Sequence, residues 1–197
     1  MRNTILMIGL VVTATVMVAC GGSPDSGKNI IGEENTSQVD SLSVALHEID
    51  SILNSGQLAH LDIYEIGQLK GIHISVQKLT ADDVSTAWIN FRKDCGGEYY
   101  YSWEDAILLK AEVPYLLQAI NTMVDNKDRE VDHEERYAYI TKDNIRLVSR
   151  AKQGKNWTTE FSIDYHKSNS AVILGEKDVQ DLISLILHGQ EKLGEIE

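Results

Sequence analysis

The sequence predicts an α+β protein in which a unit of four strands and a helix occurs twice, after one amphipathic helix. With 43% hydrophobic and 24% charged residues, the 197-residue chain has the composition of a globular protein. Apolar residues recur at helical spacing in three places, and the segments between them alternate in polarity as strands do. Similar runs also recur at a nearly constant offset, which indicates internal repeats.

The first nineteen residues have the features of an export signal. Arg2 forms a short basic start, and a mostly apolar stretch runs from Ile5 to Ala19. As a helix, these roughly fifteen residues reach only about 22 Å, which is short of the hydrocarbon core of about 30 Å that a spanning helix must cross. We therefore expect residues 1–19 to be a signal peptide and not a permanent transmembrane anchor.

The apolar stretch ends in Met17-Val18-Ala19-Cys20. This ending resembles the lipobox of bacterial lipoproteins, although Met17 stands where leucine is more common. The resemblance implies that Cys20 is diacylated, that the peptide is cut before it and that the new amino group is acylated. Two or three acyl chains hold a soluble domain stably at a membrane. We therefore expect a lipid-anchored protein of the cell envelope, in the outer membrane and facing the periplasm or the surface. A signal peptide that merely contains a cysteine is the alternative.

The charge balance argues against polyanionic partners. The formal net charge is −12, and loss of Arg2 with the signal peptide makes it −13. No basic stripe is visible in the sequence, so neither nucleic acid nor bare anionic lipid headgroups are expected as partners. Residues 20–38 are rich in Gly, Ser, Asn and acids and predict a flexible tether with a span of roughly 20 to 25 Å. A phosphate-loop pattern within it, Gly22 to Asn29, lacks the strand, helix and hydroxyl that phosphate binding needs.

The first part of the folded body is expected over residues 39–126. Apolar positions at three- and four-residue spacing predict a helix over 39–53, which Gly56 ends. The first unit follows it, and its expected elements are strands near 60–66, 72–79, 85–93 and 98–109 and a helix near 112–125. Hairpins make consecutive strands antiparallel, and each helix is expected to cover a face of its own sheet.

The second unit is expected over residues 127–197. The charged segment 125–136 lies between the two copies, lacks the glycine of a calcium loop and is interpreted as a solvated linker. The expected elements of the second unit are strands near 135–141, 145–151, 156–165 and 170–174 and a helix near 177–192.

Matching positions support a duplication. Gly71 aligns with Asn144 at an offset of 73, in turns where both residues tolerate a left-handed backbone. Phe91 aligns with Phe161 at an offset of 70, and the apolar positions of the two helices align at an offset of 66. Two shorter loops in the second copy would explain the falling offset. Because identities are few, chance similarity between two ordinary β-meanders is the alternative.

Over most of residues 57–192, this tandem four-strand-plus-helix order resembles the Whirly and Pur-type folds. The resemblance rests on element order and on no family motif. It implies that two such units pair, and in those families the basic, aromatic sheet faces bind single-stranded nucleic acid. Because this chain is acidic and exported, only the architecture is expected to apply.

No catalytic or metal-binding motif is visible. The six histidines form no i, i+4 pair, His133-Glu134-Glu135 lacks the second histidine of H-E-x-x-H, and no G-x-S-x-G elbow occurs. Once Cys20 carries lipid, Cys95 is expected to be a free thiol in a turn, with a reactive cysteine as the alternative. We expect no metal and no cofactor. An active site assembled from distant residues would nevertheless be invisible in one sequence.

The candidate ligand-binding residues are Tyr99, Tyr101 and Trp103. On a strand these three side chains share one face, where rings stack on sugars or form a hot spot for a protein partner. The alternative is that the row packs beneath a helix as core. The sequence thus predicts a non-catalytic envelope lipoprotein that serves as a binding or assembly module for an envelope protein or a glycan. An envelope hydrolase with a dispersed active site and a nucleic-acid binder of Whirly or Pur type are the alternatives.

Overall fold

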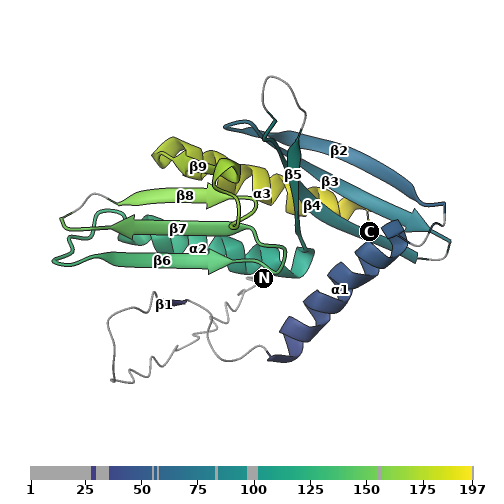
Figure 1. The fold of residues 1–197 in the computed structure, drawn as a ribbon, viewed down its shortest axis with the longest axis horizontal. Helices are drawn as coiled ribbons and strands as arrows, with labels where there is room; N and C mark the ends of the chain where they lie inside the picture. Colours follow the sequence, from purple (N-terminus) through teal and green to yellow (C-terminus); the bar gives the residue numbers. More distant parts are fainter. Residues whose placement is uncertain are drawn as a thin grey trace, which may run out of the picture.

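The chain folds as an α+β protein with two antiparallel sheets and three helices (Figure 1). The computed structural model describes residues 28–29, 36–54, 56, 58–82, 84–96, 102–154 and 157–196. Cys20, Tyr99 and Tyr101 therefore lie outside the described residues. Within this part of the chain, every helix is too short or too polar to cross a membrane.

The first sheet contains four consecutive strands in sequence order. They are β2 (His60–Leu69), β3 (Ile72–Ala81), β4 (Val84–Asp94) and β5 (Trp103–Leu108). A tight turn joins β2 to β3 through Lys70 and Gly71, which have φ angles of 47° and 80°. Positive φ at both central residues gives the turn the twist that an antiparallel hairpin requires.

The second sheet repeats the meander with shorter strands. They are β6 (Glu135–Ile140), β7 (Arg146–Ala151), β8 (Thr158–Ser162) and β9 (Ala171–Leu174), and a two-residue strand, β1 (Lys28–Asn29), pairs with β6 in parallel. Asn144, in the turn between β6 and β7, has a φ of 66°. The predicted left-handed backbone at Gly71 and Asn144 is confirmed. The strand β1 was not predicted, because two polar residues carry no periodic signal.

The helices are α1 (Thr36–Asn54), α2 (Val113–Asn126) and α3 (Glu176–Ile196). Pro114 lies in the first turn of α2, where its missing N–H costs no hydrogen bond. Asp178 caps α3 by accepting the backbone N–H of Gly175 at 2.8 Å. The expected helices and strands of the body are therefore present, with ends that differ by a few residues. The strand expected from residue 98 begins, within the described residues, at Trp103.

The expectation that each helix covers its own sheet is wrong. The helix α3, which follows the second sheet, packs across β2, β3 and β4 of the first sheet, and α2 packs on β6 and β7 of the second (Figure 1). The lengths of the helices and strands explain why each helix covers the sheet of the other unit, an arrangement that we call the exchange of the helices. At 21 residues α3 is about 31 Å long, which matches strands of 10 to 11 residues, whereas the 14-residue α2 matches strands of 4 to 6 residues.

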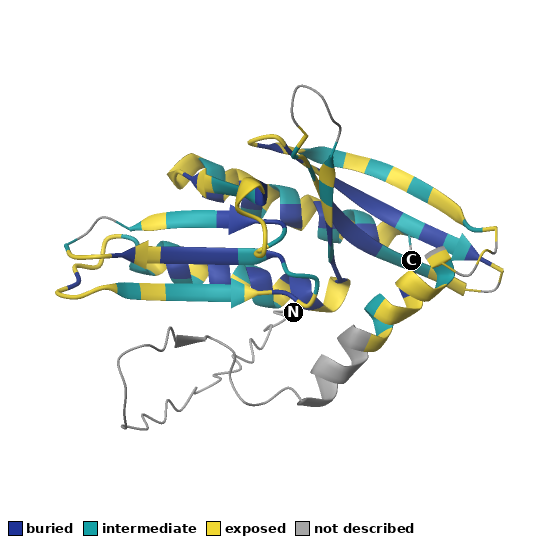
Figure 2. Cartoon of the chain, in the orientation of Figure 1, coloured by how far each residue is buried: buried dark blue, intermediate teal, exposed yellow. Residues whose placement is uncertain are grey.

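The two halves consequently share one core. Phe91 of β4 and Phe161 of β8 are both fully buried, and their ring centroids lie 5.6 Å apart. Figure 2 shows the buried residues gathered on the central strands β3, β4 and β7 and on the helix faces against them. On the other face of the first sheet, α1 closes a smaller cluster in which Ile49 covers Leu79 and Trp88. The first sheet is thus covered by α3 on one face and in part by α1 on the other, and the second sheet has α2 on one face.

Candidate functional site

The predicted aromatic row is described only at Trp103. This residue begins β5 on the face of the first sheet opposite to α3, and its side chain is 57% exposed. The guanidinium of Arg92 lies 5.5 Å from the centre of its ring and also forms an ion pair with Asp105 at 2.7 Å. Trp103 therefore does not pack beneath a helix. Ligand binding by Tyr99, Tyr101 and Trp103 stays a prediction.

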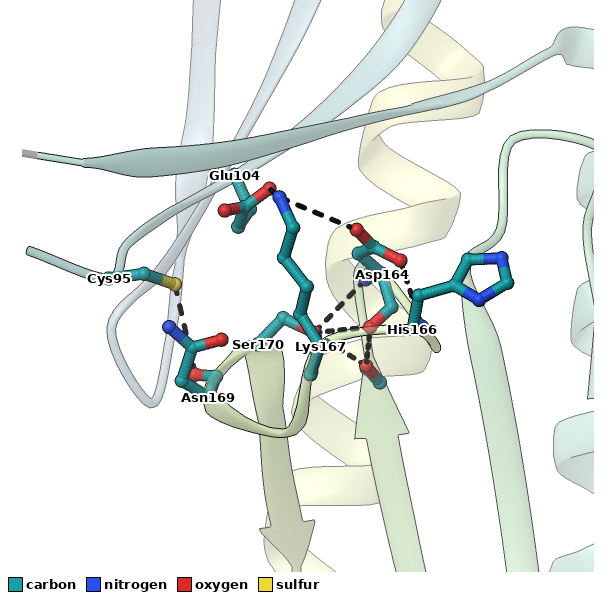
Figure 3. Close-up of polar contacts among 8 residues, drawn as sticks. Cys95, Glu104, Asp164, His166, Lys167, Asn169 and Ser170 are labelled. Carbon is teal, nitrogen blue, oxygen red and sulfur yellow. Dashed lines mark hydrogen bonds and ion pairs between the residues drawn. The ribbon is translucent and has the colours of Figure 1, made fainter.

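A polar junction joins β4 and β5 to the loop between β8 and β9 (Figure 3). The ammonium group of Lys167 contacts Glu104 at 2.5 Å and Asp164 at 3.8 Å. In the loop, the fully buried hydroxyl of Ser170 lies 2.7 Å from the hydroxyl of Ser162 and accepts the backbone N–H of Asp164 at 3.1 Å. The pair of Lys167 and Glu104 ties the two halves together at one end of the shared core, and the serine bonds hold the loop that carries Lys167.

The groups of this junction do not form a nucleophilic site. Cys95 is a free thiol whose sulfur lies 3.8 Å from the carbonyl oxygen of Asn169. Burial raises the pKa of the Cys95 thiol, whereas a reactive cysteine needs a lowered pKa. The ring of His166 lies beside Tyr165 and, in Figure 3, points away from both Cys95 and Ser170. The arrangement is suited to holding the loop in place.

One buried and one half-buried carboxylate also connect the halves. Glu112, just before α2, is 3% exposed and accepts the backbone N–H of Lys142, in the β6–β7 turn, at 2.8 Å. Reciprocally, Asp143 of that turn accepts the N–H of Ile107 in β5 at 2.6 Å. Burial raises the pKa of both carboxyl groups, although the backbone N–H donors oppose this shift. Since both carboxylates are occupied by backbone donors, they stabilise the junction between the sheets.

The clearest candidate for ligand binding is a cavity of about 270 Å³ between α2, the first turns of α3 and the inner face of the second sheet. It arises where α3 leaves the second sheet to cross to the first, so that the two helices leave a gap above β7 to β9. Its floor is aliphatic and is formed by Ile120, Met123, Val124, Leu147, Leu174, Val179 and Leu182. Its rim is polar and includes Lys127, Asp128, Trp157, Thr159, Glu176 and Gln180. We call this space the interhelix cavity.

One wall of the interhelix cavity is held rigidly. The indole N–H of Trp157 donates to the carbonyl of Arg129 at 2.8 Å, and the ring stacks on Tyr137 with centroids 5.4 Å apart. The Arg129 guanidinium lies within 6 Å of both ring centres, so a cation–π contact adds to the stack. Lys127 and Glu176 form an exposed ion pair at the rim. Such a pair is worth little, and Asp128 beside it leaves the rim with a net negative charge.

Sequence analysis did not find the interhelix cavity. In the sequence, Trp157 belongs to no recognisable motif, and the aliphatic floor residues are indistinguishable from ordinary core. Their assembly depends on the exchange of the helices, which no local pattern reports.

A second, charged depression of about 460 Å³ lies between β2 and α3. Its walls carry three glutamates together with Lys192, which pairs with Glu195 at 2.8 Å and covers the ring of Tyr64 at 4.9 Å. No group of three metal-ligating side chains is found in the described part of the chain. This depression is less suited to an apolar ligand than the interhelix cavity is.

No family model matches this chain, and comparisons with curated proteins and with solved structures found no match either.

Proposed function

We propose that this protein is a non-catalytic, lipid-anchored binding module of the cell envelope and that the interhelix cavity is its ligand site. The observation that carries the proposal is a buried aliphatic floor beneath a polar rim with one fixed aromatic wall. Small-molecule sites commonly combine an apolar surface with a few well-placed polar groups. Among the described residues, no pairing of a nucleophile with a base favours a hydrolase instead.

The size of the cavity limits the ligand. A volume of about 270 Å³ lies near the lower end of ligand pockets, and an apolar cavity of roughly 150 Å³ is enough to bind benzene. A single ring or a short aliphatic chain therefore fits the floor. Among the described residues, the rim carries Asp128 and Glu176 against the single base Lys127, which is already paired with Glu176. A cationic end of that chain is therefore favoured over a carboxylate or phosphate.

The proposal is tested by titrating the protein with octanoate and with octylamine while Trp157 fluorescence is recorded. We expect octylamine to bind more tightly than octanoate, and the variant Trp157→Phe shows which part of the signal arises at the rim. Val124→Phe places a larger side chain in the cavity and should abolish binding. Val84→Phe, at a half-exposed position on β4, is the matched control and should bind normally. Equal affinities of both phenylalanine variants would contradict this assignment of the site.

The proposed anchor is the lipidated Cys20, which lies outside the described residues. The support for it is the lipobox resemblance of residues 17–20. Cys20→Ala should release the protein from the membrane fraction, and a high-salt wash separates lipid anchoring from ionic attachment. A variant that remains in the washed pellet would rule out the anchor.

We further infer that the two sheet-and-helix units are copies of one ancestral unit related by a pseudo-two-fold axis. Two pairs of aligned positions support this inference. Phe91 and Phe161 contact each other in the core, as equivalent residues near a two-fold axis do, and Gly71 and Asn144 share a left-handed backbone in equivalent turns. Exchanged helices are also consistent with paired copies. Residues 60–126 and 135–196 of an experimental structure should superpose, and different strand connections would exclude duplication.

A further inference from the structure

The outer face of the second sheet, opposite α2, carries three arginines. Strand alternation places the partners of α2, such as Leu147, on the inner face and Arg146 on the outer face. Arg136 of β6 stands directly opposite Arg150 of β7, and Arg146 stands opposite Ile140. We call the outer surface formed by Arg136, Ile140, Arg146, Arg150 and Ile173 the arginine face.

The charge of the arginine face is only partly neutralised. Glu160 pairs with Arg146 at 2.7 Å, whereas Arg136 and Arg150 are exposed and make no ion pair with any described residue. Like charges directly opposite each other destabilise a sheet. The Nε atom of Arg146 is also buried and has no hydrogen-bond partner among the described residues. Two unpaired, exposed guanidinium groups on one surface, those of Arg136 and Arg150, are suited to an anion.

The same face carries exposed apolar side chains. Ile140 is 38% exposed and Ile173 is 52% exposed, and both project from the outer side of the sheet. Arginine beside exposed isoleucine is a combination suited to a lipid surface, because guanidinium groups bind phosphates bidentately and apolar side chains enter the interface below them.

Chain length places this sheet near the expected lipid anchor. The strand β1 pairs with β6, with Lys28 opposite Tyr137. Cys20 and Lys28 are eight positions apart, and a fully extended chain spans at most about 3.5 Å per residue, or about 28 Å in total. If Cys20 is lipidated, the edge of the second sheet therefore cannot lie far from the membrane surface.

We propose that the arginine face docks onto an anionic phospholipid surface, with its guanidinium groups at the headgroup phosphates. The proposal rests on the lipid anchor of the proposed function. The net charge of −12 does not prevent docking, because charges more than about 8 Å from the surface are screened at physiological salt. The face binds weakly by itself, but the tether gives it a high effective concentration at the membrane and so orients the protein.

The test uses the mature chain, residues 20–197, with Cys20→Ser so that no lipid contributes. Its co-sedimentation is measured with vesicles of phosphatidylcholine alone and of phosphatidylcholine mixed with phosphatidylglycerol, at low and at physiological salt. The partition coefficient should be higher on the anionic vesicles and should fall as salt rises. A basic residue near such a surface contributes about fivefold, so Arg136→Gln with Arg150→Gln should lower the partition coefficient on anionic vesicles about 25-fold.

The matched control is the double variant Lys70→Gln with Lys177→Gln. It removes two positive charges near the start of α3, away from the arginine face. It should bind anionic vesicles nearly as well as the parent chain. Equal losses in the two double variants, or equal binding of the parent chain to both vesicle types, would overturn the proposal. A different oligomeric state would also overturn it. If the parent chain sediments as a dimer and the arginine double variant sediments as a monomer, the arginine face binds a second copy of the chain. A thermal melt of the arginine variant shows whether it is folded, and octylamine titration tests the interhelix cavity separately.

Discussion

Gly189 lies where α3 crosses β4, and its replacement tests the exchange of the helices directly. A Cβ atom at this position would lie 2.9 Å from Cδ1 and 3.2 Å from Cγ1 of the buried Ile89. Replacing glycine by alanine within a helix stabilises it by about 1 kcal/mol, whereas overpacking a core costs about 1 to 3 kcal/mol. We therefore expect Gly189→Ala to lower the free energy of unfolding by about 1 kcal/mol.

Gly194 is the matched control in the same helix, because no atom lies within 4 Å of a Cβ placed there. Gly194→Ala should raise the free energy of unfolding by about 0.5 to 1 kcal/mol, with little offset from packing. The second arm removes the obstructing atom. Ile89→Val deletes Cδ1 and by itself costs about 0.5 to 1.5 kcal/mol.

If α3 lies on β4, Ile89→Val relieves the clash, and the double variant should be more stable than the sum of the single effects by about 1 kcal/mol or more. The assay is equilibrium unfolding in urea, and a parallel thermal melt should move by about 2 to 4 °C for each kcal/mol. Additivity within about 0.5 kcal/mol, or stabilisation by Gly189→Ala equal to that by Gly194→Ala, would show that α3 does not cover the first sheet.

Three further predictions follow from the junction and from Trp103. Because burial raises the pKa of Glu112 above its ordinary value of 4.5, the folded protein retains a proton that the unfolded chain loses, so stability declines as pH rises through the raised pKa. Glu112→Gln should therefore lower the free energy of unfolding most at acidic pH and less towards neutral pH. The measurement is urea unfolding of both proteins at several pH values, and a difference between them that stays constant with pH would contradict this expectation. When residues 20–126 and 127–197 are expressed separately, neither half should show a cooperative thermal melt, because each sheet needs the helix of the other half. The two halves should form a folded 1:1 complex when they are mixed. Independent folding of either half would argue against the exchange of the helices between the sheets. Trp103→Ala should cost less than about 1 kcal/mol, far below the 3 to 5 kcal/mol of a core tryptophan, and screening it against glycans and envelope extracts will show whether the aromatic row binds a ligand.

Much of the fold follows from local pattern. The order of strands and helices in the body was predictable because apolar periodicity reports which face of each element is buried. The hairpin turns were predictable at Gly71 and Asn144 because few residue types accept a positive φ, and the structure has φ angles of 80° and 66° there. Antiparallel pairing followed from the short connections between consecutive strands.

The candidate sites depended instead on contacts between distant parts of the chain. Periodicity shows that α2 and α3 each have an apolar side, but it does not say which sheet that side covers, since either sheet offers an apolar face. The exchange became evident only from the packing of Gly189 on Ile89, and the interhelix cavity is a consequence of it.

Charge shows the same division between sequence and structure. The sequence by itself determined the acidic net charge of −12 and, through local periodicity, the elements and their order. A net charge is a sum over the chain, so it cannot reveal that Arg136 and Arg150, fourteen positions apart, become direct neighbours through the register of β6 and β7. Only the tertiary structure decided which sheet each helix covers, where the cavity opens and where the arginines gather, because these features depend on pairing and packing between residues that no local pattern connects.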